Sequence, residues 1–241
     1  MMKISDKSYR EQFLDTFLRL AYKYGKWRIW SDYIYFHASS LSNLFDGECR
    51  KQRESEYLKR IEIYSPAELQ LLASLAGLVT LALDENPEQD FLGSIYEGNL
   101  EMTDPKVGQV YTPYHIAQTM AVVVDEQEIL KSNPYICAWD PCCGYGVLSI
   151  AYTSELRKAG INYQEKVLFI LQDIDSTSAL GSYIQLSLLG CAAEVRIGNV
   201  LEDNAIGTEN TWHSPMYFDE GWIKQRRLAD FIGVTKCLMA A

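Results

Sequence analysis

The 241-residue chain carries 22 Lys and Arg against 32 Asp and Glu, a formal net charge of −10 at pH 7. A protein that holds a DNA duplex neutralises phosphates with clustered basic side chains, so this charge excludes strong DNA binding without a partner. Hydrophobic residues make up 48% and charged residues 22% of the chain, the balance of an ordinary folded globular protein.

The N-terminal segment lacks the apolar core of a signal peptide, because Lys3, Asp6 and Lys7 interrupt it. The longest apolar run, at about residues 71–83, contains Ser74 and Thr80 and is shorter than a bilayer-spanning helix. The sequence therefore predicts a cytoplasmic protein that does not enter a membrane.

The cysteines and histidines do not have the spacing of a metal site. None of the six cysteines forms a C-x-x-C pair, and only three histidines accompany them. We therefore expect reduced thiols and no bound metal.

Residues 7–83 have the apolar periodicity of helices, for example at Phe13, Phe17 and Leu20. The turn-forming sequence at residues 85–87 follows this segment. We predict a helical N-terminal region over residues 1–86 and a second domain over residues 87–241.

The second domain begins with expected helices at residues 90–97 and 114–124. Strand-like and helix-like segments then alternate, which predicts an α/β fold with a parallel sheet covered by helices. The expected strands and helices are residues 135–139, 147–158, 167–171, 176–189 and 194–197.

The loop after the first expected strand reads Asp-Pro-Cys-Cys-Gly-Tyr-Gly over residues 140–146. An acid at a strand end, followed by glycines and a helix N-terminus, is typical of a crevice for a nucleoside-bearing ligand. Gly144 and Gly146 allow the backbone to approach that ligand, because a Cβ atom would clash or be strained there.

Four segments in this order resemble the N6-adenine DNA methyltransferase family, especially the modification subunits of type I restriction systems. They are DFLGSIYE at 90–97, GQVYTP at 108–113, DPCCGYG at 140–146, and a second strand that ends in acids at 173–175. Cys142 and Tyr145 replace the family's Ala and Ser, and Val147 replaces a Gly. The resemblance implies a helical N-terminal region followed by a partial Rossmann-like, S-adenosylmethionine-dependent methyltransferase sheet.

The same resemblance implies a binding site for S-adenosylmethionine. Asp173 would accept hydrogen bonds from the ribose, Ile174 would flank the adenine, and Asn199 would accept from the adenine amino group where the family usually has Asp. Asp140 would orient the glycine loop and bind water or the methionine amino group. The cofactor residues implied in this way are Tyr111, Thr112, Pro113, Asp140, Pro141, Cys142, Gly144, Gly146, Asp173, Ile174, Asn199 and Val200.

Catalysis in this family uses an Asn/Asp-Pro-Pro-aromatic tetrapeptide after a fourth strand, which holds the target amine and stacks on the flipped base. The chain does not contain that tetrapeptide. The candidate in its place is Ser-Pro-Met-Tyr at residues 214–217, which predicts catalytic roles for Ser214, Pro215 and Tyr217.

Three functions remain open at this point. The first is an adenine-N6 DNA methyltransferase that contacts DNA through a partner subunit and can form a homo-oligomer through an open sheet edge. The second is a non-catalytic S-adenosylmethionine-binding module with a regulatory or accessory role. The third, a nucleotide-binding oxidoreductase, is disfavoured because Ser149 stands where G-x-G-x-x-G requires its last glycine.

Overall fold

The computed structural model describes residues 7–103, 109–123, 133–202, 207–232 and 237–239. The N-terminal part consists of α1 (Tyr9–Tyr24), α2 (Lys26–Ser42), α3 (Arg50–Ile61) and α4 (Pro66–Glu85). The remaining helices are α5 (Phe91–Ser94), a π-helix (Ile95–Asn99), α6 (Tyr114–Val123), α8 (Val147–Lys158), α9 (Tyr163–Lys166), α10 (Ser176–Leu188), two 3-10 helices (Thr208–Asn210 and Pro215–Phe218) and α11 (Glu220–Ile232). The strands are β1 (Ile136–Asp140), β2 (Val167–Asp173), β3 (Ala192–Ile197), β4 (Thr211–His213) and β5 (Cys237–Met239).

Local sequence explains where the N-terminal helices start. Both α1 and α4 begin with a capping box, in which Ser8 pairs with Glu11 and Ser65 pairs with Glu68. Gly25 separates α1 from α2 at a φ of +85°, a conformation that favours glycine. The chain can therefore turn sharply and pack α2 against α1.

Helix α4 is, within the described residues, the one helix long and apolar enough by length and composition to cross a membrane. It has 20 residues, more than the apolar run of residues 71–83 indicates, because Pro66 and the capping box start it earlier. It packs against α1, α2, α5 and α10. The core helix of a folded domain can have the same length and composition, so these two properties do not distinguish a core helix from a membrane-spanning helix.

The strands form one sheet in the order β4-β3-β2-β1-β5. The first three strands and β5 run parallel, whereas β4 pairs antiparallel with β3. The predicted α/β class, with a helical region before a partial Rossmann-like sheet, is confirmed. The parallel pairing brings the carboxyl ends of β1, β2 and β3 to one edge of the sheet.

Alternate residues of the strands face two separate layers, as the period of two in a β-strand requires. Ile136, Phe169 and Val195 belong to the large core that α8, α10 and the N-terminal helices complete. Leu168 and Ala192 face the other way and pack in a smaller cluster with Trp222 of α11. Both faces are therefore covered, which is usual for parallel strands.

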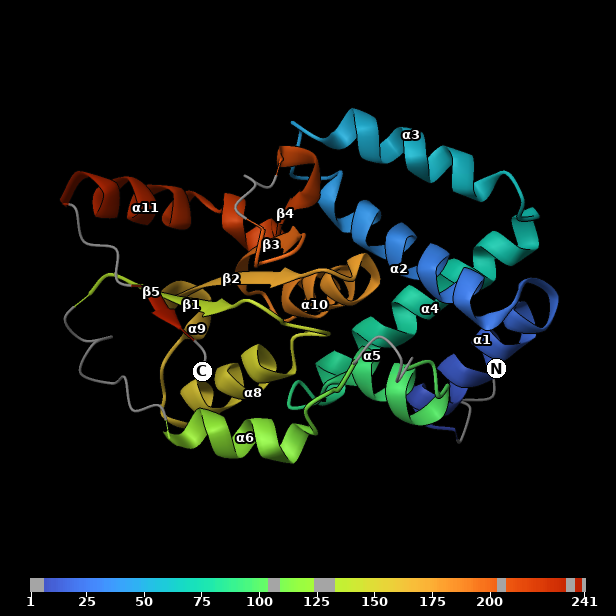
Figure 1. Ribbon diagram of the computed structural model, residues 1–241, viewed down its shortest axis with the longest axis horizontal. Helices are drawn as coiled ribbons and strands as arrows, with labels where there is room; N and C mark the ends of the chain where they lie inside the picture. The colour runs from blue at the N-terminus through green and yellow to red at the C-terminus, as the bar shows by residue number, and fades with distance from the viewer. Residues whose placement is uncertain (1–6, 104–108, 124–132, 203–206, 233–236, 240–241) are drawn as a thin grey trace, which may run out of the picture.

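The N-terminal helices and the sheet layer share one continuous core. The N-terminal helices gather beside α10 at one end of the molecule, and α11 lies at the other end (Figure 1). Trp30 Nε1 donates a hydrogen bond to Tyr145 Oη at 2.7 Å, which joins α2 to the glycine loop. The boundary after residue 86 therefore stays a prediction.

Candidate cofactor site

A cavity of about 830 Å³ lies at the carboxyl ends of β1, β2 and β3. Its volume is in the range of small-molecule and cofactor pockets. Most of the residues expected to bind the cofactor line it: Tyr111, Thr112, Asp140, Pro141, Cys142, Gly144, Asp173, Ile174, Asn199 and Val200.

Pro113 and Gly146 do not line this cavity. Pro113 precedes α6, and its carbonyl oxygen accepts hydrogen bonds from the first turn of that helix. Gly146 is the N-cap of α8 with a φ of +85°, and a Cβ placed there would lie 3.0 Å from the Cβ of Ser182. Gly146 therefore allows α8 and α10 to pack closely and acts behind the cavity wall.

The glycine loop is fixed to the end of β2. The backbone N–H of Gly144 donates to Asp173 Oδ2 at 2.8 Å, and that of Cys143 donates to the carbonyl of Gln172 at 2.9 Å. Asp140 accepts from the backbone N–H of Cys142 at 3.1 Å. The two strand-end acids therefore shape the loop that forms the cavity wall.

Both acids retain capacity to accept further hydrogen bonds. Asp173 Oδ1 accepts from the backbone N–H of Asp175 at 2.9 Å, so each Asp173 oxygen has one protein donor and a further lone pair. Asp140 Oδ2 is buried and has no hydrogen-bond partner among the described residues. Burial raises the pKa of both carboxyl groups. A ligand that brings N–H or O–H donors would satisfy them.

The segment before α6 folds over the glycine loop. The Tyr111 hydroxyl is hydrogen-bonded to Ser178 Oγ of α10 at 3.0 Å, and a Cβ at Gly144 would lie 3.2 Å from the Tyr111 ring. Gly144 has a φ of +52°, so both its backbone conformation and its neighbour favour glycine. Tyr111 thus closes one side of the cavity.

The end of β3 forms the opposite side. Asn199 Oδ1 accepts from the backbone N–H of Leu201 at 3.0 Å, and its amide nitrogen donates to Glu202 at 3.0 Å. Ile174 is 69% exposed and lines the cavity with Val200. This side offers apolar surface next to an amide oxygen, which suits a flat heterocycle with an amino group.

Sequence reasoning missed two kinds of residue here. Asp175 accepts from Thr177 N at 3.0 Å, Ser178 Oγ at 2.8 Å and Gln109 Nε2 at 3.4 Å, and so connects α10 to the segment before α6. Its position directly before a helix is an N-cap signal that could have identified it. Trp27 and Tyr96 also line the cavity, but their helical spacing is the same as that of core aromatics.

The structure does not bring the catalytic candidates to this cavity. Because β4 runs antiparallel, its carboxyl end lies at the amino end of β3, away from the glycine loop. Ser214 is fully buried and bonds to Ala193 N and Cys191 O. Neither Pro215 nor Tyr217 lines the cavity, and the Tyr217 ring packs 4.2 Å from the His213 ring.

A further strand, β5, lies on the other side of β1. It pairs parallel with β1 on the side away from β2, and Met239 is in register with Trp139. The sequence made residues 214–217 the catalytic candidate because they stand at about the expected distance from Asn199.

The comparison with protein families matches residues 87–230 to the model described as N-6 DNA methylase. The chain belongs to the N-6 DNA methylase family. Its function is that of an S-adenosylmethionine-dependent methyltransferase-like protein, with S-adenosylmethionine as the cofactor. The match covers the glycine loop, β1 to β4 and most of α11.

A structure from Listeria monocytogenes, described as a candidate class I S-adenosylmethionine-dependent methyltransferase, is similar to this chain. The sequence identity is 14%, the TM-score is 0.36, and the alignment covers 81% of this chain and 70% of that one. The comparison with curated proteins gave no match.

The residues of the cavity fit this cofactor. The free lone pairs of Asp173 suit the two ribose hydroxyls, the unpaired Asp140 Oδ2 suits an ammonium group, and Ile174 offers apolar surface for the adenine. In the part of the chain that the structure describes, no group of three or more His, Cys, Asp or Glu side chains could hold a metal ion.

Proposed function

We propose that this chain is the cofactor-binding part of an adenine-N6 DNA methyltransferase that engages DNA together with a partner subunit. The observation that carries the proposal is the cavity in which Asp140, Gly144 and Asp173 meet at the ends of adjacent parallel strands. Family membership supports the reaction class. A role in restriction–modification and a cytoplasmic location are parts of the same proposal.

In this proposal Asp173 binds the ribose hydroxyls while its Oδ2 keeps the glycine loop in place. Ile174 and Val200 pack on the adenine, and Asn199 Oδ1 accepts from its amino group through its second lone pair. Asp140 binds the methionine ammonium, and Tyr111 and Thr112 close over that end. Bound S-adenosylmethionine supplies an electrophilic methyl group for an exocyclic amine.

A partner is part of the proposal because of the charge of the chain. The net charge of −10 repels phosphates at long range, and a duplex needs clustered cations to bind tightly. A basic subunit that carries DNA recognition would supply them.

A second candidate function is a non-catalytic S-adenosylmethionine-binding module. One observation favours it: Ser214, Pro215 and Tyr217 lie outside the cavity, so no residue that the structure describes is assigned to the target amine. The two functions share a cofactor and differ in methyl transfer.

Methyl incorporation separates the two functions. We expect the isolated chain to transfer radiolabelled methyl groups to unmethylated DNA very slowly or not at all over hours at low salt, because acceptors for the target amine are missing from the cavity. Robust turnover would contradict this expectation. If that turnover were lost in Ser214→Ala and in Tyr217→Ala, residues 214–217 would be established as a working catalytic loop.

A further inference from the structure

The N-terminal helices contribute one wall of the cofactor cavity, and no role proposed above uses it. Trp27, Trp30 and Ser31 belong to α2, and Tyr96 belongs to the π-helix. All four residues line the cavity that contains the glycine loop. A ligand bound at the ends of the strands therefore also meets the N-terminal helices.

Three aromatic rings lie in a row along this wall. The Trp27 ring meets the Tyr96 ring edge to face at 6.1 Å, and the Tyr96 ring meets the Tyr111 ring edge to face at 5.8 Å. Tyr111 lies against Gly144, since a Cβ at Gly144 would be 3.2 Å from the Tyr111 ring. These three side chains, the aromatic row, therefore reach from the glycine loop to α2.

Trp27 is the accessible end of the aromatic row. It is 58% exposed, whereas Tyr96 is 2% exposed and supports the rings on either side of it. Large aromatic side chains usually bury most of their surface when they have only a structural role. The exposed surface of Trp27 is therefore available to a ligand in the cavity.

The charged side chains of the cofactor cavity are acidic. Among the described residues that line it, Asp140, Asp173 and Asp175 carry carboxyl groups and none is Lys, Arg or His. Basic side chains of α3 line a neighbouring cavity, which shares only Ser31 and Thr177 with this one. The cofactor cavity itself therefore has an acidic and aromatic lining.

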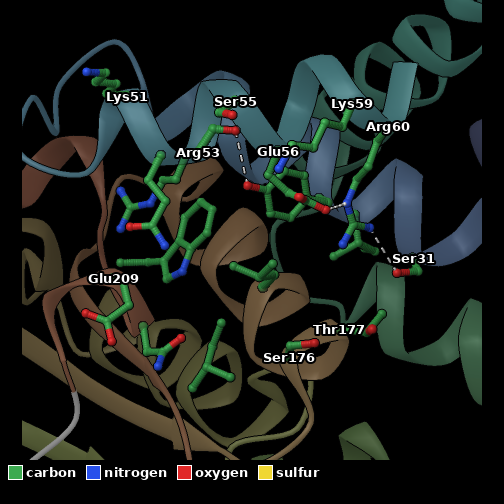
Figure 2. Close-up of a pocket in the computed structure, with 17 residues that line it drawn as sticks. Ser31, Lys51, Arg53, Ser55, Glu56, Lys59, Arg60, Ser176, Thr177 and Glu209 are labelled. Carbon is green, nitrogen blue, oxygen red and sulfur yellow. Dashed lines mark hydrogen bonds and ion pairs between the residues drawn. The ribbon is translucent and has the colours of Figure 1, made fainter. Parts of the chain in front are cut away.

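The arginines of the neighbouring cavity are engaged in ion pairs. Arg60 binds Glu56 at 2.8 Å and Asp32 at 3.1 Å, and Figure 2 shows Arg60 turned toward Glu56. Arg53 binds Asp46 at 2.7 Å. The lining of the cofactor cavity therefore favours a cationic ligand, because carboxylates attract cations and aromatic ring faces attract them through the ring quadrupole.

The charge that distinguishes the methyl donor from its product falls beside the aromatic row. S-adenosylmethionine carries a positive sulfonium, which becomes the neutral thioether of S-adenosylhomocysteine once the methyl group has been transferred. The sulfur joins the ribose to the amino-acid chain, so a ribose at Asp173 and an ammonium at Asp140 place it next to Gly144. Gly144 is the residue that the Tyr111 ring covers.

We propose that the aromatic row binds the sulfonium and makes the cavity select the methyl donor over the demethylated product. The inference rests on the placement of the cofactor in the proposed function. Tyr111 contacts the sulfonium at the glycine loop, and Trp27 closes over it from α2. The Asp140 and Asp173 carboxylates stabilise the same positive charge. Trp27 is thus a specificity-determining residue that the N-terminal helices supply.

Calorimetry of three ligands with the full chain tests this selection. The ligands are S-adenosylmethionine, S-adenosylhomocysteine and sinefungin, in which a carbon with a protonated amine replaces the methylated sulfur. S-adenosylmethionine and sinefungin each bind at least about tenfold more tightly than S-adenosylhomocysteine, because both are positively charged at this position. Equal or tighter binding of S-adenosylhomocysteine would overturn the inference alone. Absence of binding by all three ligands would overturn the proposed function as well.

Variants of Trp27 locate the selection. Trp27→Leu keeps an apolar side chain without a ring, so the affinity for S-adenosylmethionine falls at least about threefold and that for S-adenosylhomocysteine changes less than about twofold. Trp27→Phe keeps a ring face and most of the preference. The control Tyr22→Leu alters a residue of α1 that is 96% exposed and outside the cavity, and it leaves the preference unchanged. Parallel losses for both ligands in Trp27→Leu, or equal losses of preference in Trp27→Leu and Trp27→Phe, would contradict the role of the ring.

Fluorescence gives a second readout, which does not depend on ligand preference. Trp27 is the one exposed residue among the five tryptophans, all of which the structure describes. Saturation with S-adenosylmethionine should therefore reduce the quenching of tryptophan fluorescence by acrylamide, and Trp27→Phe should lack this reduction. Quenching that saturating S-adenosylmethionine leaves unchanged in wild type would overturn the contact between Trp27 and the cofactor.

Discussion

Asp90 connects the N-terminal helices to the sheet layer through a partly buried carboxyl group. Its Oδ1 accepts from Gly93 N and from Gln185 Nε2 of α10, both at 2.8 Å. Burial raises the pKa of Asp90 to about 6, from an ordinary value of 3.8. The folded protein therefore holds a proton on Asp90 more tightly than the unfolded chain does.

This pKa predicts a pH dependence of stability. The protonated carboxyl group stabilises the fold fully below about pH 4, and the contribution is lost as the pH rises through 6. Asp90→Asn keeps the Oδ1 acceptor and does not ionise. The free energy of unfolding of this variant, minus that of wild type, should therefore increase between pH 4 and 7, by at most about 1.4 kcal/mol per pH unit. Urea unfolding at four pH values measures this, and a difference that stays constant with pH would refute it.

Single residues of the cofactor cavity were the most predictable part of the molecule. Asp140 and Asp173 each end a strand of a parallel sheet, so their meeting at one edge follows from the alternation of strands and helices. The sequence could not show that Gly144 N is bonded to Asp173, because that contact joins two loops 29 residues apart. Trp27 and Tyr96 were also unpredictable, since they reach the cavity only through the packing of separate helices.

At the scale of elements, the helices and parallel strands agree with the sequence within a few residues. Strands β4 and β5 were not among the expected strands. A short polar strand such as β4 has no periodicity that separates it from a loop, and its antiparallel direction is set by pairing with β3. The catalytic candidates, which follow β4, therefore lie at the end of the sheet away from the cofactor cavity.

The shared core makes the N-terminal helices necessary for the fold. Helix α2 packs against α10, and removing residues 1–86 would expose that apolar face. We expect residues 87–241 alone to lack cooperative unfolding and near-UV circular dichroism. Trp30→Phe in the full chain is a smaller change, and it should cost more than the roughly 1 kcal/mol of its hydrogen bond to Tyr145, because it also leaves a cavity at a fully buried side chain. A fragment that unfolds cooperatively would establish two independent domains.

At the scale of the whole molecule, one edge of the sheet is formed by a short strand of three residues, β5. Strand β5 is the last strand beside β1 in the part of the chain that the structure describes. A sheet edge without cover is a template for pairing with another chain. We expect a homo-oligomer or, in its place, a complex with a partner subunit. Sedimentation velocity at micromolar concentration checks this, and a clean monomer of 27.5 kDa that also fails to bind a partner would contradict it.

Charge is distributed unevenly over the same molecule. The chain is acidic overall, yet α3 presents Lys51 and Lys59 without ion-pair partners among the described residues. The net charge alone predicted that the isolated chain attracts a DNA duplex only weakly. It could not locate these two cations, because their position depends on where α3 packs against α2 and β4.

The measurement that tests the central claim most directly is calorimetric titration of S-adenosylhomocysteine into wild type, Asp173→Ala and Asp173→Asn. Asp173→Ala removes the ribose acceptors and the anchor of Gly144, so its affinity should fall by at least about tenfold. Asp173→Asn keeps one acceptor oxygen and should bind with an intermediate affinity. The account is contradicted if wild type does not bind, or if Asp173→Ala binds as tightly as wild type.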